Sequence, residues 1–204
     1  MSSATITTSA RLMNSTPQTE EQAMVRKVAV SSFLGNFIEW FDYASYSYFA
    51  TTIALVFFPT DNHTVAMLQT FGVFALSFIL RPIGALFWGS YGDKKGRKAA
   101  LAHSIMFMSG ASFLIGCLPS YSVIGVGAPI LLLLLRMVQG FSASGEYAGA
   151  ATFLGEYAPT SKRGIYCSLI PASTAIGLLA GSTLATLMTA NMNSSAMVGW
   201  GWRV

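Results

Sequence analysis

Charged side chains are scarce in this sequence. Of its 204 residues, 10% are Asp, Glu, Lys or Arg, whereas a soluble domain carries about a quarter of such residues. Hydrophobic residues make up 53% of the chain. This balance excludes an ordinary water-soluble domain and favours an integral membrane protein.

Other absences narrow the possible functions. Two cysteines, Cys117 and Cys167, offer no disulfide framework, and neither histidine has a second His or Cys at the spacing of a metal site. We therefore expect no metal and no other cofactor. No catalytic motif of a hydrolase, a P-loop enzyme or a zinc protease occurs, so we expect no enzyme. The net charge of +4 does not indicate nucleic-acid binding, because the basic residues lie between apolar segments.

Five apolar segments follow a polar N-terminal tail. Residues 1–24 are rich in Ser, Thr and Gln, and we expect them to form a disordered cytoplasmic tail. Each apolar segment reaches the roughly 20 residues that a spanning helix requires. We predict an all-α membrane region over residues 25–204, with spans at about 28–57, 65–91, 99–118, 129–156 and 165–190.

Lysine and arginine mark one side of this predicted bundle. Nine of them lie in the tail or in the second and fourth joints between spans, and the first and third joints contain none. Cytoplasmic loops of membrane proteins are enriched in Lys and Arg. We therefore expect a multi-pass protein with its N-terminus in the cytoplasm.

Five charged residues fall inside the predicted spans. They are Glu39 and Asp42 in the first span, Arg81 in the second, and Arg136 and Glu146 in the fourth. Charges at this depth are costly and usually face a bundle interior or an aqueous path. We expect these five to line one shared polar cavity near the middle of the membrane.

In the first span, polar residues recur with the period of a helix. Asn36 shares a face with Glu39, Tyr43 and Tyr46, and Asp42 lies at the margin of that face. Two roles remain open for the carboxylates. They can pair with the arginines and hold the bundle together, or they can bind substrate or a proton.

The charge sum favours a proton carrier among the buried groups. Three carboxylates against two guanidinium groups leave one negative charge if all are ionised, and burial favours the protonated form of an unpaired carboxyl. Glu39, Asp42 and Glu146 are the candidates. Arginine stays charged and can instead hold an anionic substrate group through two parallel hydrogen bonds.

The loop "GSYGDKKGRKAAL" contains four of the twelve basic residues. It resembles the signature between helices two and three of the major facilitator superfamily, which is carried here by Gly89, Asp93, Lys94, Gly96, Arg97 and Lys98. The glycines allow a tight turn, and Asp93 is expected to cap a helix and to pair with a cation.

Further stretches resemble the same superfamily. "RMVQGFSASG" is similar to its fourth-helix motif, and "EYAPTSKRG", with Glu156 and Arg163, is similar to the motif that follows. "GNFIEWFDYASYSYFA" and "RPIGALFWGSYGD" resemble the branch of metabolite:proton symporters, which includes carriers of proline and betaine, shikimate, 2-oxoglutarate and citrate.

The resemblance implies a fold and a function. Members have twelve helices in two related halves with the substrate site between them, and this chain offers five helices of the N-terminal half. The implied function is symport of a small polar metabolite or organic anion with a proton across the bacterial inner membrane. A C-terminal half would then be a required partner, besides the lipid bilayer. The alternative is a non-transporting membrane remnant or a partner-binding fragment.

Overall fold

A computed structural model describes residues 16–203, apart from the side chains of residues 16–22, 146–148 and 153. The described part contains helices and no strand, which confirms the expected all-α class. The helices are α2 (Thr16–Tyr48), α3 (Ala50–Phe57), α4 (His63–Lys95), α5 (Arg97–Gly116), α6 (Tyr121–Ile124), α7 (Gly127–Ala143), α8 (Glu146–Tyr157), α9 (Arg163–Asn191), α10 (Ser194–Gly199) and the 3₁₀ helix η1 (Gly201–Arg203).

Three helices, α4, α5 and α9, are long and apolar enough to cross a membrane, and α7 is a shorter apolar helix. Only 22% of the most apolar window of each long helix is buried within the protein. Large apolar side chains such as Leu68, Leu86 and Phe113 are instead exposed. Such a surface suits the acyl chains of a bilayer, as expected for a multi-pass membrane protein.

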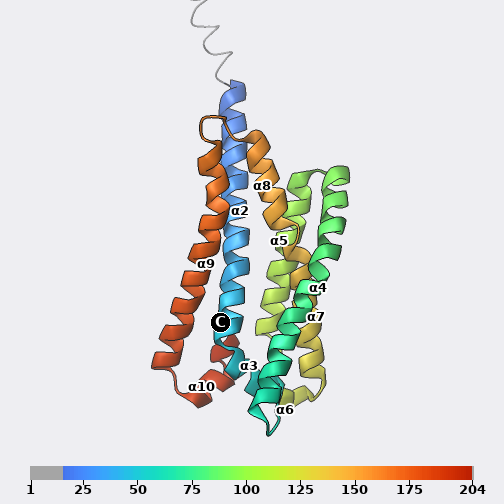
Figure 1. Cartoon of the computed structure of the whole chain (residues 1–204), viewed down its shortest axis with the longest axis vertical. Coiled ribbons are helices and arrows are strands. Elements are labelled where there is room, and N and C mark those ends of the chain that lie inside the picture. Colours follow the sequence, from blue (N-terminus) through green and yellow to red (C-terminus); the bar gives the residue numbers. More distant parts are fainter. Residues whose placement is uncertain (1–15, 204) are drawn as a thin grey trace, which may run out of the picture.

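Two helix pairs form the frame of the bundle. Helix α2 packs along α9, and α4 packs along α7, with α5 beside α7 (Figure 1). Glycines let the backbones approach: Gly177 and Gly181 of α9 face the backbone of α2 near Phe41. Gly140 of α7 faces the backbone of Ser77 in α4 in the same way. Small residues at helix contacts are typical of membrane proteins.

The basic joints gather at one end of the bundle. The start of α2, the α4–α5 joint and the α8–α9 joint lie at the top of Figure 1, whereas α6 and α10 lie at the bottom. Successive joints thus lie at alternate ends of the bundle, as expected for consecutive apolar segments that each cross it once. Near the C-terminus, Nη1 of Arg203 donates a hydrogen bond of 3.3 Å to the carbonyl of Gly116.

Two of the predicted spans are interrupted. The span expected at 28–57 consists of α2 and α3, which meet at Phe49, and the span expected at 129–156 consists of α7 and α8. The second break falls at Ser144 and Gly145. A Cβ atom at Gly145 would lie 2.8 Å from Cβ of Trp88, so a glycine is needed for this close contact. Glycine also weakens a helix interior.

Helix α2 begins at Thr16, before the predicted span. Residues 16–24 are therefore helical, which corrects the expectation that residues 1–24 form a disordered tail. The stretch "TPQTEEQAM" combines a proline near its start with Gln, Glu, Ala and Met, which favour helices although most are polar. Residues 1–15 lie outside the described part of the chain.

Candidate functional site

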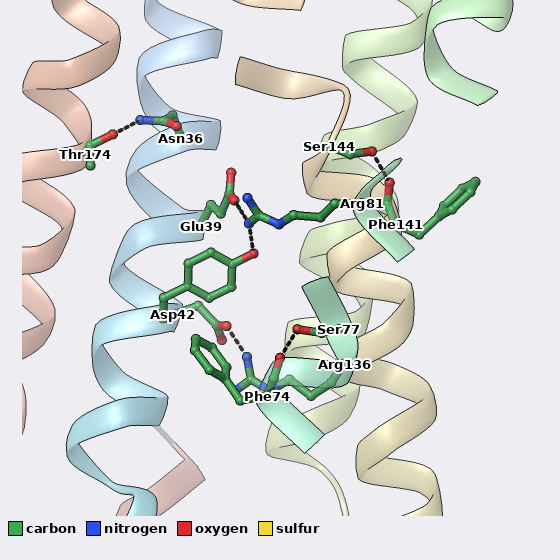
Figure 2. A network of polar contacts seen from close by, with 11 residues as sticks. Asn36, Glu39, Asp42, Phe74, Ser77, Arg81, Arg136, Phe141, Ser144 and Thr174 are labelled. Atoms are coloured by element: carbon green, nitrogen blue, oxygen red, sulfur yellow. Dashed lines mark hydrogen bonds and ion pairs between the residues drawn. The ribbon is translucent and has the colours of Figure 1, made fainter. Parts of the chain in front are cut away.

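Helix α2 carries two carboxylates inside the bundle, and each meets an arginine (Figure 2). Glu39 pairs with Arg81 of α4, and Asp42 pairs with Arg136 of α7. The two carboxylates are three residues apart, so they lie one above the other on the same side of α2. Pairing with the arginines was one of the two roles that the sequence offers for these carboxylates, and both pairs are formed. They link α2 to α4 and to α7.

Arg81 joins α4 to two side chains of α2. Its Nη2 donates hydrogen bonds to Oε1 of Glu39 and to the hydroxyl of Tyr43. Its guanidinium carbon lies 4.6 Å from the ring centre of Phe78. The Glu39 side chain is 3% exposed, but that of Arg81 is 28% exposed. Among the described residues, the Nε of Arg81 is buried without a hydrogen-bond partner, so it is a further donor at this site.

Arg136 forms a more enclosed pair. Its Nη1 donates to Oδ2 of Asp42, and its guanidinium carbon lies 4.0 Å from the ring centre of Tyr46. The Tyr46 hydroxyl in turn donates to the carbonyl of Thr70 at 2.9 Å. The side chain of Arg136 is 4% exposed. A buried guanidinium held by a carboxylate and an aromatic face is suited to stabilising the bundle.

The two pairs line different cavities. Glu39 and Arg81 border a cavity of about 470 Å³ between α2, α4 and α7. Asp42 and Arg136 border another, of about 210 Å³, which extends toward Arg203 at the opposite end from the basic joints. The sequence predicts one shared cavity, whereas in the structure each ion pair borders a cavity of its own.

Asn36 does not join these pairs. Its Nδ2 donates to Ser173 and Thr174 of α9, both at 2.8 Å, and to the carbonyl of Ile170 at 3.0 Å. It therefore ties α2 to α9, on another side of α2 from Glu39 (Figure 2). The side chain of Glu146, the third predicted carboxylate, lies outside the described residues.

The sequence does not predict several polar and aromatic contacts around these ion pairs. Phe78 stacks on Arg81, and Ser112 of α5 accepts a hydrogen bond of 2.7 Å from Nε2 of Gln139. Phe78 and Arg81 are three residues apart, a spacing that could have revealed their shared face. No comparable signal links Ser112 to Gln139, which belong to different helices. Among the described side chains, no group of three or more His, Cys, Asp and Glu residues could hold a metal.

The loop signature joins α4 to α5 through a single residue. Gly96 has a φ angle of 93°, which residues other than glycine rarely adopt. The tight joint therefore requires glycine at this position. Asp93 pairs with Arg97 at 3.4 Å, as expected. It does not cap a helix, because it lies in the last turn of α4 and the residue before α5 is Gly96. Gly89, Lys94 and Lys98 are exposed around this joint.

The second conformational motif lies around the α8–α9 joint. Glu156 is in the last turn of α8, and Arg163 is the first residue of α9. Both are exposed. Within the described part of the chain, neither forms an ion pair.

A family model described as sugar (and other) transporter matches residues 27–204. The chain belongs to this family of the major facilitator superfamily. The family consists of transporters rather than enzymes, which confirms two expectations from the sequence, the superfamily and the absence of an enzymatic role.

Individual members of the transporter family are similar over most of the chain. A proline/betaine transporter of Salmonella typhimurium is 41% identical over 184 residues, which cover 90% of this chain and 37% of the relative. A glycine betaine/proline/ectoine/pipecolic acid transporter of Dickeya dadantii has the same identity and coverage. A putative proline/betaine transporter of Staphylococcus aureus is 41% identical over 88% of this chain and 39% of its own length. No solved structure matches.

Proposed function

We propose that this chain acts as the N-terminal part of a proton-coupled symporter in the bacterial inner membrane. The observation that carries the proposal is the pair of Glu39 and Arg81 at a cavity between α2, α4 and α7. The chain spans 37% of the length of its curated relatives, so we propose that it works together with a second transmembrane region.

The proposed substrate is a small zwitterion or organic anion. The relatives are named as transporters of proline, betaine, ectoine and pipecolic acid. Glu39 and Arg81 offer one negative and one positive group, and Trp40 lines the same cavity. A substrate carboxylate fits a guanidinium fork, and a substrate cation fits a carboxylate or an aromatic face.

The two ion pairs support a mechanism for coupling. A substrate carboxylate that binds Arg81 competes with Glu39 for the same Nη2 donor. Glu39 is buried, so once released it is an unpaired carboxylate in a desolvated site, which favours uptake of a proton. Substrate and proton would then load together. Asn36, Asp42 and Arg136 hold the surrounding helices in this proposal, and Glu146 remains a candidate second proton site.

The orientation follows from the basic residues. We propose that the end of the bundle with the basic joints faces the cytoplasm, because Lys and Arg are enriched in cytoplasmic loops. The N-terminus would then be cytoplasmic. The α4–α5 joint, with Asp93, and the α8–α9 joint, with Glu156 and Arg163, would lie on the inner side, where they can act in conformational change.

Uptake in proteoliposomes tests the proposal. The chain is reconstituted with the C-terminal remainder of a curated relative, and labelled proline and glycine betaine are offered with and without an inward proton gradient. We expect accumulation that requires the gradient and that is lost in Arg81→Gln. Accumulation that is unaffected by a collapsed gradient would exclude proton coupling. No uptake of either compound, from a reconstituted and folded protein, would favour the non-transporting alternative.

A further inference from the structure

A groove lies between α2 and α5 at the basic end of the bundle. Its volume is about 490 Å³. Lys27 of α2 and Lys98 of α5 border it, and Val28, Leu101 and Ile105 supply apolar surface. The groove is separate from the cavities of Glu39 and Asp42, and the proposed transport mechanism does not use it.

The two lysines of this groove form no ion pair with any side chain that the structure describes. No carboxylate lines the groove, and neither lysine forms an ion pair, among the residues whose side chains are described. Arg97, next to Lys98, is by contrast paired with Asp93. Two unpaired ammonium groups that face one groove favour an occupant with negative charge.

The groove is polar at its mouth and apolar along its length. Lys98 is in the first turn of α5, and Ile105 follows seven residues later, which corresponds to about 10 Å along the helix. The apolar surface thus runs from the level of the basic joint into the membrane-spanning part of α5. Lysines near helix ends extend toward the headgroup layer of a bilayer.

We propose that this groove binds one anionic phospholipid. Its phosphate lies between the ammonium groups of Lys27 and Lys98, and one acyl chain lies along Val28, Leu101 and Ile105. A lysine near a membrane surface attracts an anionic headgroup. We therefore expect loss of one lysine to weaken lipid binding roughly fivefold, and loss of both to weaken it about 25-fold. A zwitterionic lipid should bind the groove more weakly, because its headgroup carries a positive charge that offsets the attraction of its phosphate to the lysines.

Native mass spectrometry of the 204-residue chain in detergent tests the site. Phosphatidylglycerol and phosphatidylcholine are titrated separately, and bound lipid is counted. The variants are Lys27→Gln, Lys98→Gln and the double variant. The control is Lys94→Gln with Lys95→Gln, which removes the same charge at the same end of the bundle but outside the groove. Circular dichroism verifies the helix content of each variant.

We expect one tightly bound phosphatidylglycerol, weakened about 25-fold in the Lys27/Lys98 double variant and little changed in the control. Equal weakening in both double variants would overturn the proposal, since it would show attraction to the basic end in general. Displacement of the lipid by millimolar inorganic phosphate would also overturn it, because the acyl chain would then contribute nothing. A dimer that protects the groove and excludes lipid would assign the surface to a second copy instead.

Discussion

Glu39 and Asp42 are neighbours on α2 with different surroundings. Both arginines border a cavity, but the one that pairs with Glu39 is 28% exposed, whereas the one that pairs with Asp42 is 4% exposed and covered by Tyr46. A ligand that reaches Arg81 can replace Glu39 as the partner of its guanidinium group. We therefore propose coupling for Glu39 and structural stabilisation for Asp42, and the two proposals predict different effects of the same chemical change.

Glu39→Gln should uncouple transport without abolishing binding. The amide keeps the shape of the side chain but cannot take up a proton, so the driving force of the gradient is lost. In the reconstituted transporter, we expect loss of gradient-driven accumulation and retention of substrate exchange between equal pools. Glu146→Gln serves as the comparison. Accumulation at the wild-type level in Glu39→Gln would show that this carboxylate does not carry the proton.

Asp42→Asn should lower stability. The change leaves the guanidinium of Arg136 buried without a counter-charge, and breaking a buried pair in this way costs about 3–5 kcal/mol. We expect a clear fall in the midpoint of thermal unfolding in detergent. Asp61→Asn, in the exposed joint before α4, is the matched control and should leave the midpoint almost unchanged. Equal midpoints for the two variants would contradict a stabilising role of the Asp42 pair.

Much of the site was accessible from the sequence. Charges in apolar segments are rare enough to mark Glu39, Asp42, Arg81 and Arg136, and their opposite signs predict pairing. The sequence could not assign the partners, because these depend on which helices adjoin α2. For the same reason Asn36, which repeats with the period of Glu39, was grouped with it but bonds to α9.

At the scale of helices, α9 can approach the backbone of α2 closely because two glycines of α9 have no side chain at the contact. A Cβ atom at Gly177 would lie 2.7 Å from the carbonyl oxygen of Phe37, and one at Gly181 would lie 2.8 Å from that of Phe41. Both neighbours are helix backbone, which cannot move aside as a flexible side chain can. The packing of α2 against α9 therefore requires glycine at these two positions.

Gly177→Leu should separate α9 from α2. The added side chain has no space against the backbone of α2, so we expect the variant to insert into the membrane but to unfold at a markedly lower temperature. The control is Gly110→Leu in α5, where a Cβ atom would meet nothing within 4 Å. Resistance to protease and thermal unfolding of the two variants can be compared. Similar behaviour of both would argue against tight packing at Gly177.

Asp93→Asn at the α4–α5 joint should affect transport rather than stability. Asp93 and Arg97 are 69% and 49% exposed, and exposed ion pairs contribute little to folding. We expect normal membrane insertion and thermal unfolding, with a reduced transport rate in the reconstituted protein if the pair acts as a conformational latch. An unchanged transport rate would contradict the latch and would leave the basic joint only its role in orienting the protein in the membrane.

The helices themselves follow closely from the sequence, but their interruptions do not. The apolar runs at about 65–91, 99–118 and 165–190 overlap α4, α5 and α9, since length and hydropathy are local properties. The breaks at Phe49 and Gly145 lie within apolar sequence that hydropathy treats as continuous. At Gly145 the chain lies against Trp88 of α4, a contact between residues remote in the chain that hydropathy does not reveal.

At the scale of the whole molecule, charge is distributed along one axis. The joints with Lys94, Lys95, Arg97 and Lys162 share one end of the bundle, and the joints at the other end contain no lysine or arginine until Arg203. Such a distribution favours a single orientation in the membrane.

Reporter fusions test that orientation. A reporter fused after Val204 should be active only in the periplasm, and one inserted between Lys94 and Lys98 only in the cytoplasm, because the basic end is retained inside. Replacing the basic residues of the α4–α5 joint by Gln should produce a mixed orientation. The opposite pattern of activity in the unchanged chain would refute the proposed topology.

The ion pairs of α2 also bear on biogenesis. Helix α2 precedes both arginines in the chain, so Glu39 and Asp42 lack these counter-charges until Arg81 and Arg136 follow. Entry of α2 alone is therefore unfavourable. Arg81 arrives with α4 and Arg136 only with α7, so α2 should remain at the insertion machinery until those helices emerge. We therefore expect the order of the charges along the chain to influence the order in which the helices are released into the bilayer.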